Sequence, residues 1–384
     1  MPHAAGRLAM VAVLVVAGAA ACTGSRGSAS AKAVEVSRGR CGAGWHAPHG
    51  GEQTIAVHNI GAVTMEVELV DPASHGVYAE MESLAPGTTR PFHLVLARGS
   101  YALTCLPEDS DAETGPAVTV MDGPATGATA VQPVTEADLG PAVASYRAHV
   151  TAGLTALAAD VSSLRTVLSS GNRERSRQAW LTCQMAYSRL GAAYDTFGDA
   201  ADAVDGLPDG LPNGVHDGGF TGLRRIEYGL WHGQALPSLR PVADRLAGDV
   251  AALRKDFAGE RTDPNDLPLR AHEILENSLQ FELTGEADQG GGAGLATISA
   301  NLEGTRMVLD AIAPVVRQRY PRWPATLGEL TALQRLVAAQ DRRGVWRPVQ
   351  ELSAADRERL DGALGQLLED LAPIAAVGEV RRTQ

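Results

Sequence analysis

The sequence predicts a two-domain protein in which an N-terminal all-β sandwich precedes an all-α helical bundle. Three observations lead to this fold class. Apolar and polar residues alternate in short segments between residues 33 and 121, which is typical of half-buried strands. From residue 135 onward, apolar residues recur at helical spacing instead. A chain of 384 residues, with 45% hydrophobic and 20% charged residues, is long and apolar enough for both domains.

Residues 1–21 are predicted to be a signal peptide. A short basic start precedes an apolar run from Leu8 to Ala21, which is shorter than the roughly 20 residues that a membrane-spanning helix needs. The segment Ala19-Ala20-Ala21-Cys22 resembles a lipoprotein cleavage box, and residues 22–32 form a Gly/Ser/Ala-rich tether. We therefore expect lipidation at Cys22 and a lipid-anchored protein on the outer face of the cytoplasmic membrane. The alternative is a plain secretory signal and a secreted or periplasmic protein.

The predicted β domain spans residues 33–121. Its expected strands are 54–59, 64–70, 77–82, 92–96, 101–105 and 117–121. Because strand side chains repeat every two residues, Glu66 and Glu68 share one face, as do Glu80 and Glu82. This pattern fits either a solvated acidic face or a cation site.

Three cysteines remain once Cys22 is assigned to lipid. Cys41 and Cys105 lie in the same predicted domain and can form a disulfide in an oxidising compartment. Cys183 falls in a helical segment and is expected to be a buried thiol.

Residues 122–134 form a predicted linker rich in Gly, Pro and Thr, and the helical domain spans residues 135–384. Its expected helices are 136–169, 173–197, 222–231, 239–257, 268–283, 296–319, 327–339 and 354–376.

The segment 221–233 is the most informative part of this domain. Arg224, Glu227 and Trp231 lie three and four residues apart and share one helical face. His272 and Glu276 are one helical turn apart and offer a nitrogen and an oxygen ligand together. Further carboxylates stand at loop-like positions, namely Asp199, Asp205, Glu286 and Asp288.

This segment resembles the signature of the imelysin family, in its EfeO-like branch of extracytoplasmic iron-uptake proteins. The family pattern is Gly-Phe-His-x-Ile-Glu followed by Leu-Trp, in which the His and the Glu bind metal. Arg224 stands here at the His position, and Ser188 and Gly191 replace acidic residues that are usual in the family. The β domain is similar to the cupredoxin-like module of the same proteins, through Cys41, the Glu66/Glu68 strand, the Glu80–Glu82 segment and the run ending at Cys105.

The resemblance implies a component of an EfeUOB-type iron uptake system that binds iron or hands it to a ferric permease, with a Dyp-type haem peroxidase as a further partner. Glu227 matches the family's carboxylate ligand, and His272 and Glu276 are candidate further ligands because of their spacing. Iron is the expected metal, and zinc and copper are the alternatives. Two other interpretations stay open at this centre. Arg224 or Arg189 forms a buried ion pair with Glu227, or the guanidinium receives an anionic or chelated ligand. A scaffold or sensor without its own metal is the alternative function.

An enzymatic function is not expected. A hydrolytic zinc site needs about three protein ligands and an open position, whereas this sequence lacks His-Glu-x-x-His and Gly-x-Ser-x-Gly. The formal net charge of −12 also argues against nucleic acid as a partner.

Overall fold

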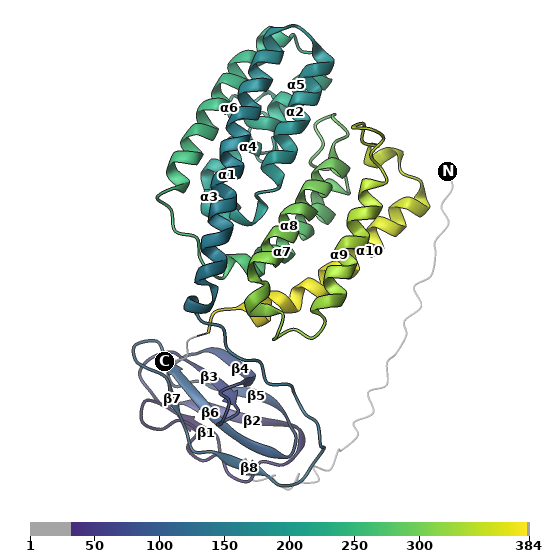
Figure 1. Cartoon of the computed structure of the whole chain (residues 1–384). Helices are drawn as coiled ribbons and strands as arrows, with labels where there is room; N and C mark the ends of the chain where they lie inside the picture. Colours follow the sequence, from purple (N-terminus) through teal and green to yellow (C-terminus); the bar gives the residue numbers. More distant parts are fainter. Residues whose placement is uncertain (1–31, 382–384) are drawn as a thin grey trace, which may run out of the picture.

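The computed structural model describes residues 32–381 and consists of a β domain and a helical domain joined end to end (Figure 1). The predicted signal peptide, Cys22 and all but the last residue of the predicted tether lie outside the described residues. In the described part of the chain, no helix is long and apolar enough to cross a membrane.

The β domain contains two sheets. One has the strand order β1-β2-β5, and the other has the order β4-β3-β6-β7 with β8 paired to β6. The strands are β1 (Val34–Val36), β2 (Gly51–Asn59), β3 (Met65–Val70), β4 (Val77–Leu84), β5 (Thr89–Leu96), β6 (Gly99–Pro107), β7 (Glu113–Thr114) and β8 (Val118–Val120). All six predicted strands are present, whereas β1 and β7 are too short to be recognised from alternation.

The two sheets enclose one apolar core. Val57 on β2 and Phe92 on β5 face Leu69 on β3 and Leu103 on β6, and all four are buried. The predicted disulfide between Cys41 and Cys105 is present, and it ties the segment after β1 to β6. The hydrophobic alternation therefore produces a β domain of two packed sheets, and the disulfide links them through the segment after β1 and strand β6.

The helical domain is built from long helices and short turns. The helices are α1 (Glu136–Ser169), α2 (Arg173–Ser188), α3 (Tyr194–Phe197), α4 (Asp199–Asp205), α5 (Gly222–Trp231), α6 (Leu236–Phe257), α7 (Asp266–Asn277), α8 (Gly294–Val316), α9 (Trp323–Ala338) and α10 (Ala354–Gly378). Their apolar faces meet in one core that extends from Val134 to Ile374.

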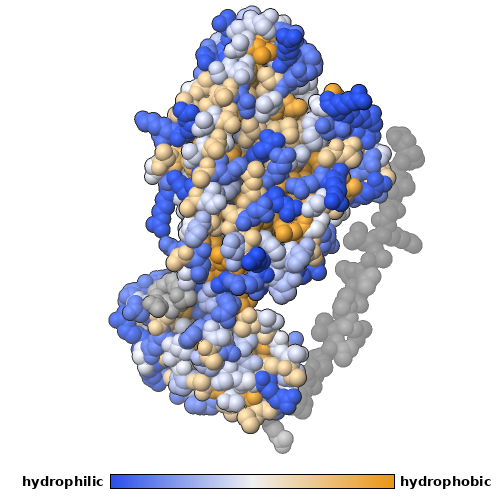
Figure 2. Space-filling model, viewed as in Figure 1, coloured by the Kyte–Doolittle hydropathy of each residue, from blue (hydrophilic) through white to orange (hydrophobic). Residues whose placement is uncertain are grey.

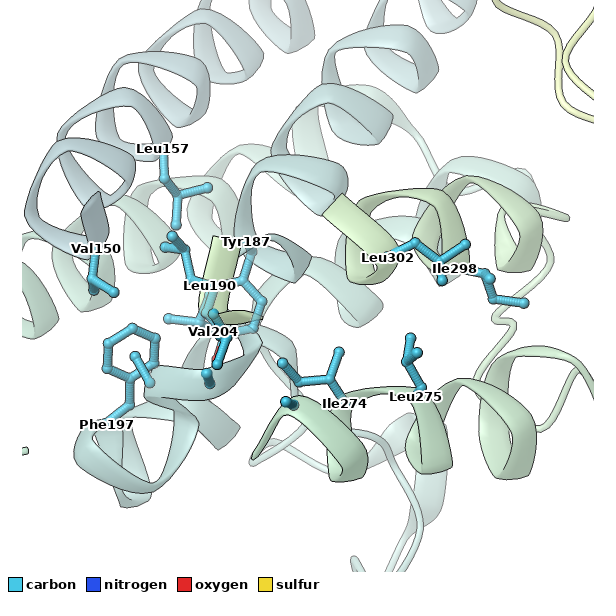
Figure 3. Packing of buried hydrophobic residues seen from close by; sticks show 14 of the residues in the cluster. Val150, Leu157, Tyr187, Leu190, Phe197, Val204, Ile274, Leu275, Ile298 and Leu302 are labelled. Carbon is cyan, nitrogen blue, oxygen red and sulfur yellow. The ribbon is translucent and has the colours of Figure 1, made fainter. Parts of the chain in front are cut away.

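The predicted helix 173–197 is wrong after residue 188, because α2 ends at Ser188 and a 3₁₀ turn and the short helix α3 follow it. A β-carbon at Gly191 would lie 2.9 Å from a side-chain carbon of Ile274, and one at Gly304 would lie 2.7 Å from the backbone oxygen of Arg189. Helices α7 and α8 therefore pack directly onto this turn, and Leu190, Tyr187 and Ile274 meet there (Figure 3). Tertiary packing overrides the helical pattern at this point.

The predicted helix 268–283 also changes its form. Helix α7 ends at Asn277 and a π-helical turn, Ser278–Glu282, follows it. The amide of Leu283 donates to the carbonyl of Ser278, which is the i to i+5 bond of a π-helix. This extra residue per turn rotates Glu282 into the domain interior, where it is 6% exposed.

The C-terminal segment returns to the β domain. It follows α10 and reaches the start of α1 beside strands β3 and β4 (Figure 1). Val380 forms a parallel bridge with Val134, and the amide of Val380 donates to Asn265 Oδ1 at 2.8 Å. On the face shown in Figure 2, apolar residues form separate patches between hydrophilic ones on both domains.

Candidate functional site

Helix α5 carries the signature residues and has the predicted bounds, Gly222–Trp231. It begins at a position that only glycine accommodates, since Gly222 has a φ of +76° and a β-carbon there would collide with the backbone oxygen of Val204. This close contact fixes α5 against α4. It directs Arg224 and Glu227 into the interior, where they are 4% and 0% exposed.

Arg224 lies at the centre of a ring of carboxylates. Its Nη2 donates to Glu282 Oε1 at 2.6 Å, and its Nε lies 3.2 Å from Asp205 Oδ1. Its Nη1 lies 3.5 Å from Glu227 Oε2 and donates to the backbone oxygen of Ala287 at 3.3 Å. One guanidinium therefore contacts side chains from α4, α5 and the π-helical turn.

Glu227 is held on its other side by backbone amides. Its Oε1 accepts hydrogen bonds from the amides of Gln289 at 3.1 Å and Gly291 at 3.0 Å. A β-carbon at Gly291 would lie only 2.6 Å from this oxygen, so the loop approaches the carboxylate closely because the residue is glycine. Within residues 32–381, Glu227 Oε2 accepts no hydrogen bond, and its partner is the charge of the Arg224 guanidinium.

The ring holds more carboxyl groups than one guanidinium neutralises. Burial raises the pKa of Asp205 to about 6, although Arg224 and Gln184 act to lower it. Burial also raises the pKa of Glu227 to about 8, with Asp288 adding to the rise and Arg224 opposing it. For Arg224, burial alone would lower the pKa, but Asp205, Glu282 and Glu227 together raise it. Arg224 is therefore permanently charged, and it is the counter-ion of this buried ring.

The other predicted residues of the helical domain lie elsewhere. Trp231 is half-buried, with its ring 5.1 Å from Trp180 and 4.8 Å below the guanidinium of Arg177. His272 Nδ1 lies 3.8 Å from Glu276 Oε2, and the two are a partly exposed pair on α7.

Of the two arginines considered for the ion pair, Arg224 contacts Glu227, whereas Arg189 pairs with Glu303. Ser188 is buried and its hydroxyl donates to the backbone of its own helix at Gln184. The ion pair expected as one of the alternatives at this centre is therefore present.

The ligand-type clusters of the described residues lie in the β domain. Between residues 32 and 381, side chains of His, Cys, Asp or Glu converge in threes at only two places, Glu66–Glu68–Glu80 and Glu80–Glu82–Glu379. In each group the oxygen atoms lie within 4.8 Å of one another. We call these four β-domain residues and Glu379 the acidic cluster.

Glu68 is the buried member of the acidic cluster. It stands directly opposite Glu80 in the pairing of β3 with β4, where two like charges repel each other. It is only 4% exposed, and its Oε1 has no hydrogen-bond partner. Burial, followed by the charge of Glu66, raises the pKa of Glu68 to about 7. A fully solvated acidic face, the other interpretation of the alternation, is therefore wrong for Glu68.

The remaining members are more open. Glu66 is half-buried, and its pKa is raised by burial and by Glu80 and Glu82. Glu82 and Glu379 are exposed. Glu80 accepts two hydrogen bonds from Arg381, from Nε at 2.9 Å and from Nη2 at 3.1 Å.

Sequence reasoning missed Glu282, Glu379 and Arg381. Glu282 reaches Arg224 through a π-helical turn, for which the sequence carried no recognised signal. The C-terminal pair meets Glu80 across about 300 residues of chain, and helical or strand periodicity gives no information about such a contact.

Comparison with known proteins agrees with this architecture. Residues 142–374 match the Imelysin family (Peptidase_M75). This span is more than half of the chain, and the chain therefore belongs to the imelysin family.

Individual relatives are similar over most of the chain. The protein is 25% identical over 329 residues to the iron uptake system component EfeO of Escherichia coli strain K12, a match that covers 85% of this chain and 86% of the relative. The same identity and coverage hold for the proteins of that name from Escherichia coli O157:H7 and Shigella flexneri. These relatives are named as iron uptake components and not as peptidases, which agrees with the expectation that the chain is not an enzyme.

Proposed function

We propose that this protein is the iron-binding component of an extracytoplasmic uptake system of the EfeUOB type, and that it delivers iron to a ferric permease. Family membership and the names of relatives that match 85% of the chain support this function. A haem peroxidase of the Dyp type is the proposed second partner. Cys22 is the proposed lipid anchor, which would hold the protein at the cell envelope.

We assign the iron cargo to Glu66, Glu68 and Glu80. The observation that carries the assignment is the buried Glu68 carboxylate with its unpartnered Oε1. A buried charged oxygen without a partner is costly unless a cation or a proton satisfies it. Because the pKa of Glu68 is about 7, a metal ion can displace the proton of this carboxyl group at near-neutral pH.

The ligand chemistry fits a hard metal ion. The cluster offers only carboxylate oxygens, which suit hard cations better than soft ones. Iron, as the cargo, would be held by the buried carboxylate of Glu68 and by the more exposed carboxylates of Glu66 and Glu80. Zinc and copper are the competitors, and both prefer nitrogen or sulfur ligands more strongly.

In the helical domain, the ion pairs of Arg224 support a structural role for the signature centre. The guanidinium of Arg224 already forms ion pairs with the three carboxylates on which a cation would depend, and it would repel a cation placed among them. Glu227 is accordingly a stabilising residue in this proposal, and His272 with Glu276 is a surface pair.

The test is calorimetric titration of the full chain with ferrous iron under anaerobic conditions and with ferric citrate. We expect binding by the wild type, a loss of at least tenfold in Glu68→Gln, and unchanged affinity in His272→Gln, which is the matched control. Unchanged affinity in Glu68→Gln would overturn the assignment. Absence of binding by the wild type would favour the scaffold or sensor. The ion pairs of Arg224 also support that function, because they occupy the carboxylates at the family's metal position.

A further inference from the structure

The acidic cluster lies at the junction between the domains, against the segment that follows α10. The amide of Arg381 donates to the backbone oxygen of Val134 at 2.8 Å, which places the segment beside the start of α1. From there the Arg381 side chain crosses to β4 and bonds both oxygens of Glu80, at 2.9 and 3.1 Å. The end of the helical domain is thus joined to the acidic cluster by a bidentate ion pair between Arg381 and Glu80.

Arg381 acts as the resident cation of this cluster. Its side chain is only 10% exposed. Burial alone would lower its pKa, but Glu80, Glu379 and Glu68 raise it, so the guanidinium stays charged among them. Neither Glu66 nor Glu68 has an ion pair within 4.0 Å in the part of the chain that the structure describes, so Glu80 is the member that Arg381 neutralises directly.

A metal ion and Arg381 therefore compete for the same carboxylate. Both oxygens of Glu80 already accept hydrogen bonds from the guanidinium, which leaves fewer lone pairs for a metal. A cation placed between Glu66, Glu68 and Glu80 would also repel the nearby guanidinium. The double or triple charge of a metal ion interacts with the three carboxylates more strongly than the single charge of the Arg381 guanidinium does.

We propose that a metal ion enters the acidic cluster by exchanging with Arg381, so that metal loading releases the C-terminal segment from the β domain. This inference rests on the proposed metal site and adds its regulation. Glu379 precedes Arg381 by two residues, and its carboxylate lies within 4.8 Å of those of Glu80 and Glu82. Release of the segment removes this like charge from the cluster as well.

The first test compares the affinity of wild type and Arg381→Gln for zinc, which is redox-inert, and for ferrous iron. Removal of the competing charge should tighten binding by about five- to tenfold. Arg38→Gln is the matched control, because Arg38 is an exposed arginine of the β domain paired with Asp109, and its affinity should equal that of the wild type. Equal or weaker binding by Arg381→Gln would overturn the exchange.

The second test measures hydrogen exchange of residues 376–381 with and without saturating zinc. We expect faster exchange in the metal-bound wild type, and little change on adding metal to Arg381→Gln, in which the ion pair is already absent. Slower exchange in the loaded wild type would contradict release. Failure of both proteins to bind metal would refute the proposed site itself, whereas equal binding by both would refute only the exchange with Arg381.

Discussion

Replacement of Arg224 by methionine should destabilise the protein strongly and in a pH-dependent way. The substitution keeps the approximate length of the side chain but removes the counter-ion of Asp205, Glu227 and Glu282. Loss of one partner from a buried ion pair typically costs about 3–5 kcal/mol, because the remaining charge is left uncompensated. The protein can avoid that charge only by binding protons.

The pH dependence of this destabilisation follows from the free energy needed to protonate the carboxyl groups that have lost Arg224. To protonate a carboxyl group of ordinary pKa near 4 costs about 5 kcal/mol at pH 8 and about 1.4 kcal/mol at pH 5, at about 1.4 kcal/mol per pH unit. In the wild type, Asp205 with a pKa of about 6 is ionised at pH 8, and Glu227 with a pKa of about 8 is half ionised. At pH 5 both are largely protonated already. We therefore expect Arg224→Met to lose about 3–5 kcal/mol at pH 8 and about 1–2 kcal/mol at pH 5.

The assay is urea denaturation followed by circular dichroism at the two pH values. Arg38→Met is the control, since its ion pair with Asp109 is exposed and should contribute less than about 1 kcal/mol. A loss below about 1 kcal/mol for Arg224→Met at pH 8 would refute the argument. So would a loss that is larger at pH 5 than at pH 8.

Three further outcomes are expected. Gly222→Ala should lower the free energy of unfolding by about 2 kcal/mol or more through backbone strain and a clash, whereas Gly248→Ala, within α6 and free of close neighbours, should be neutral or stabilising in the same denaturation assay. Cys41→Ser should cost about 4 kcal/mol by opening a 64-residue loop, and a melting temperature equal to that of the oxidised wild type would count against this. Because the folded pKa of Glu68 is about 7 and its ordinary value is 4.5, the folded state binds the extra proton between these values and stability falls as the pH rises through this window. Glu68→Gln should therefore gain about 1–3 kcal/mol over the metal-free wild type above pH 7 and nothing below pH 4.5, and a constant difference across the range would be inconsistent with the shift.

Local patterns predicted much of the fold. Alternation located six strands, and the apolar spacing located α5 to the residue, because each pattern reports which face of an element is buried. The disulfide followed from two cysteines in one predicted domain of a chain that is expected to be exported. The helix break after Ser188 was not predictable in this way, since it depends on Ile274 of α7 packing against Gly191 and on Gly304 of α8 packing against the backbone of Arg189.

For the candidate site, too, local patterns predicted which residues share a face but not which residues they contact. Alternation placed Glu66 and Glu68 on one face of a strand, but only the register of β3 with β4 sets Glu68 against Glu80. Whether that face is solvated depends on what covers it, and the covering residues come from the far end of the chain. Likewise, a helical period showed that Arg224 and Glu227 share a face, while their partners Asp205 and Glu282 became evident only in three dimensions.

Diffraction from iron-loaded crystals at the iron absorption edge would locate the bound iron. We expect an anomalous peak bonded to Glu68 and to Glu66 or Glu80, with the guanidinium of Arg224 still in its ring of carboxylates. A peak bonded to Glu227, or to His272 and Glu276, would contradict this assignment.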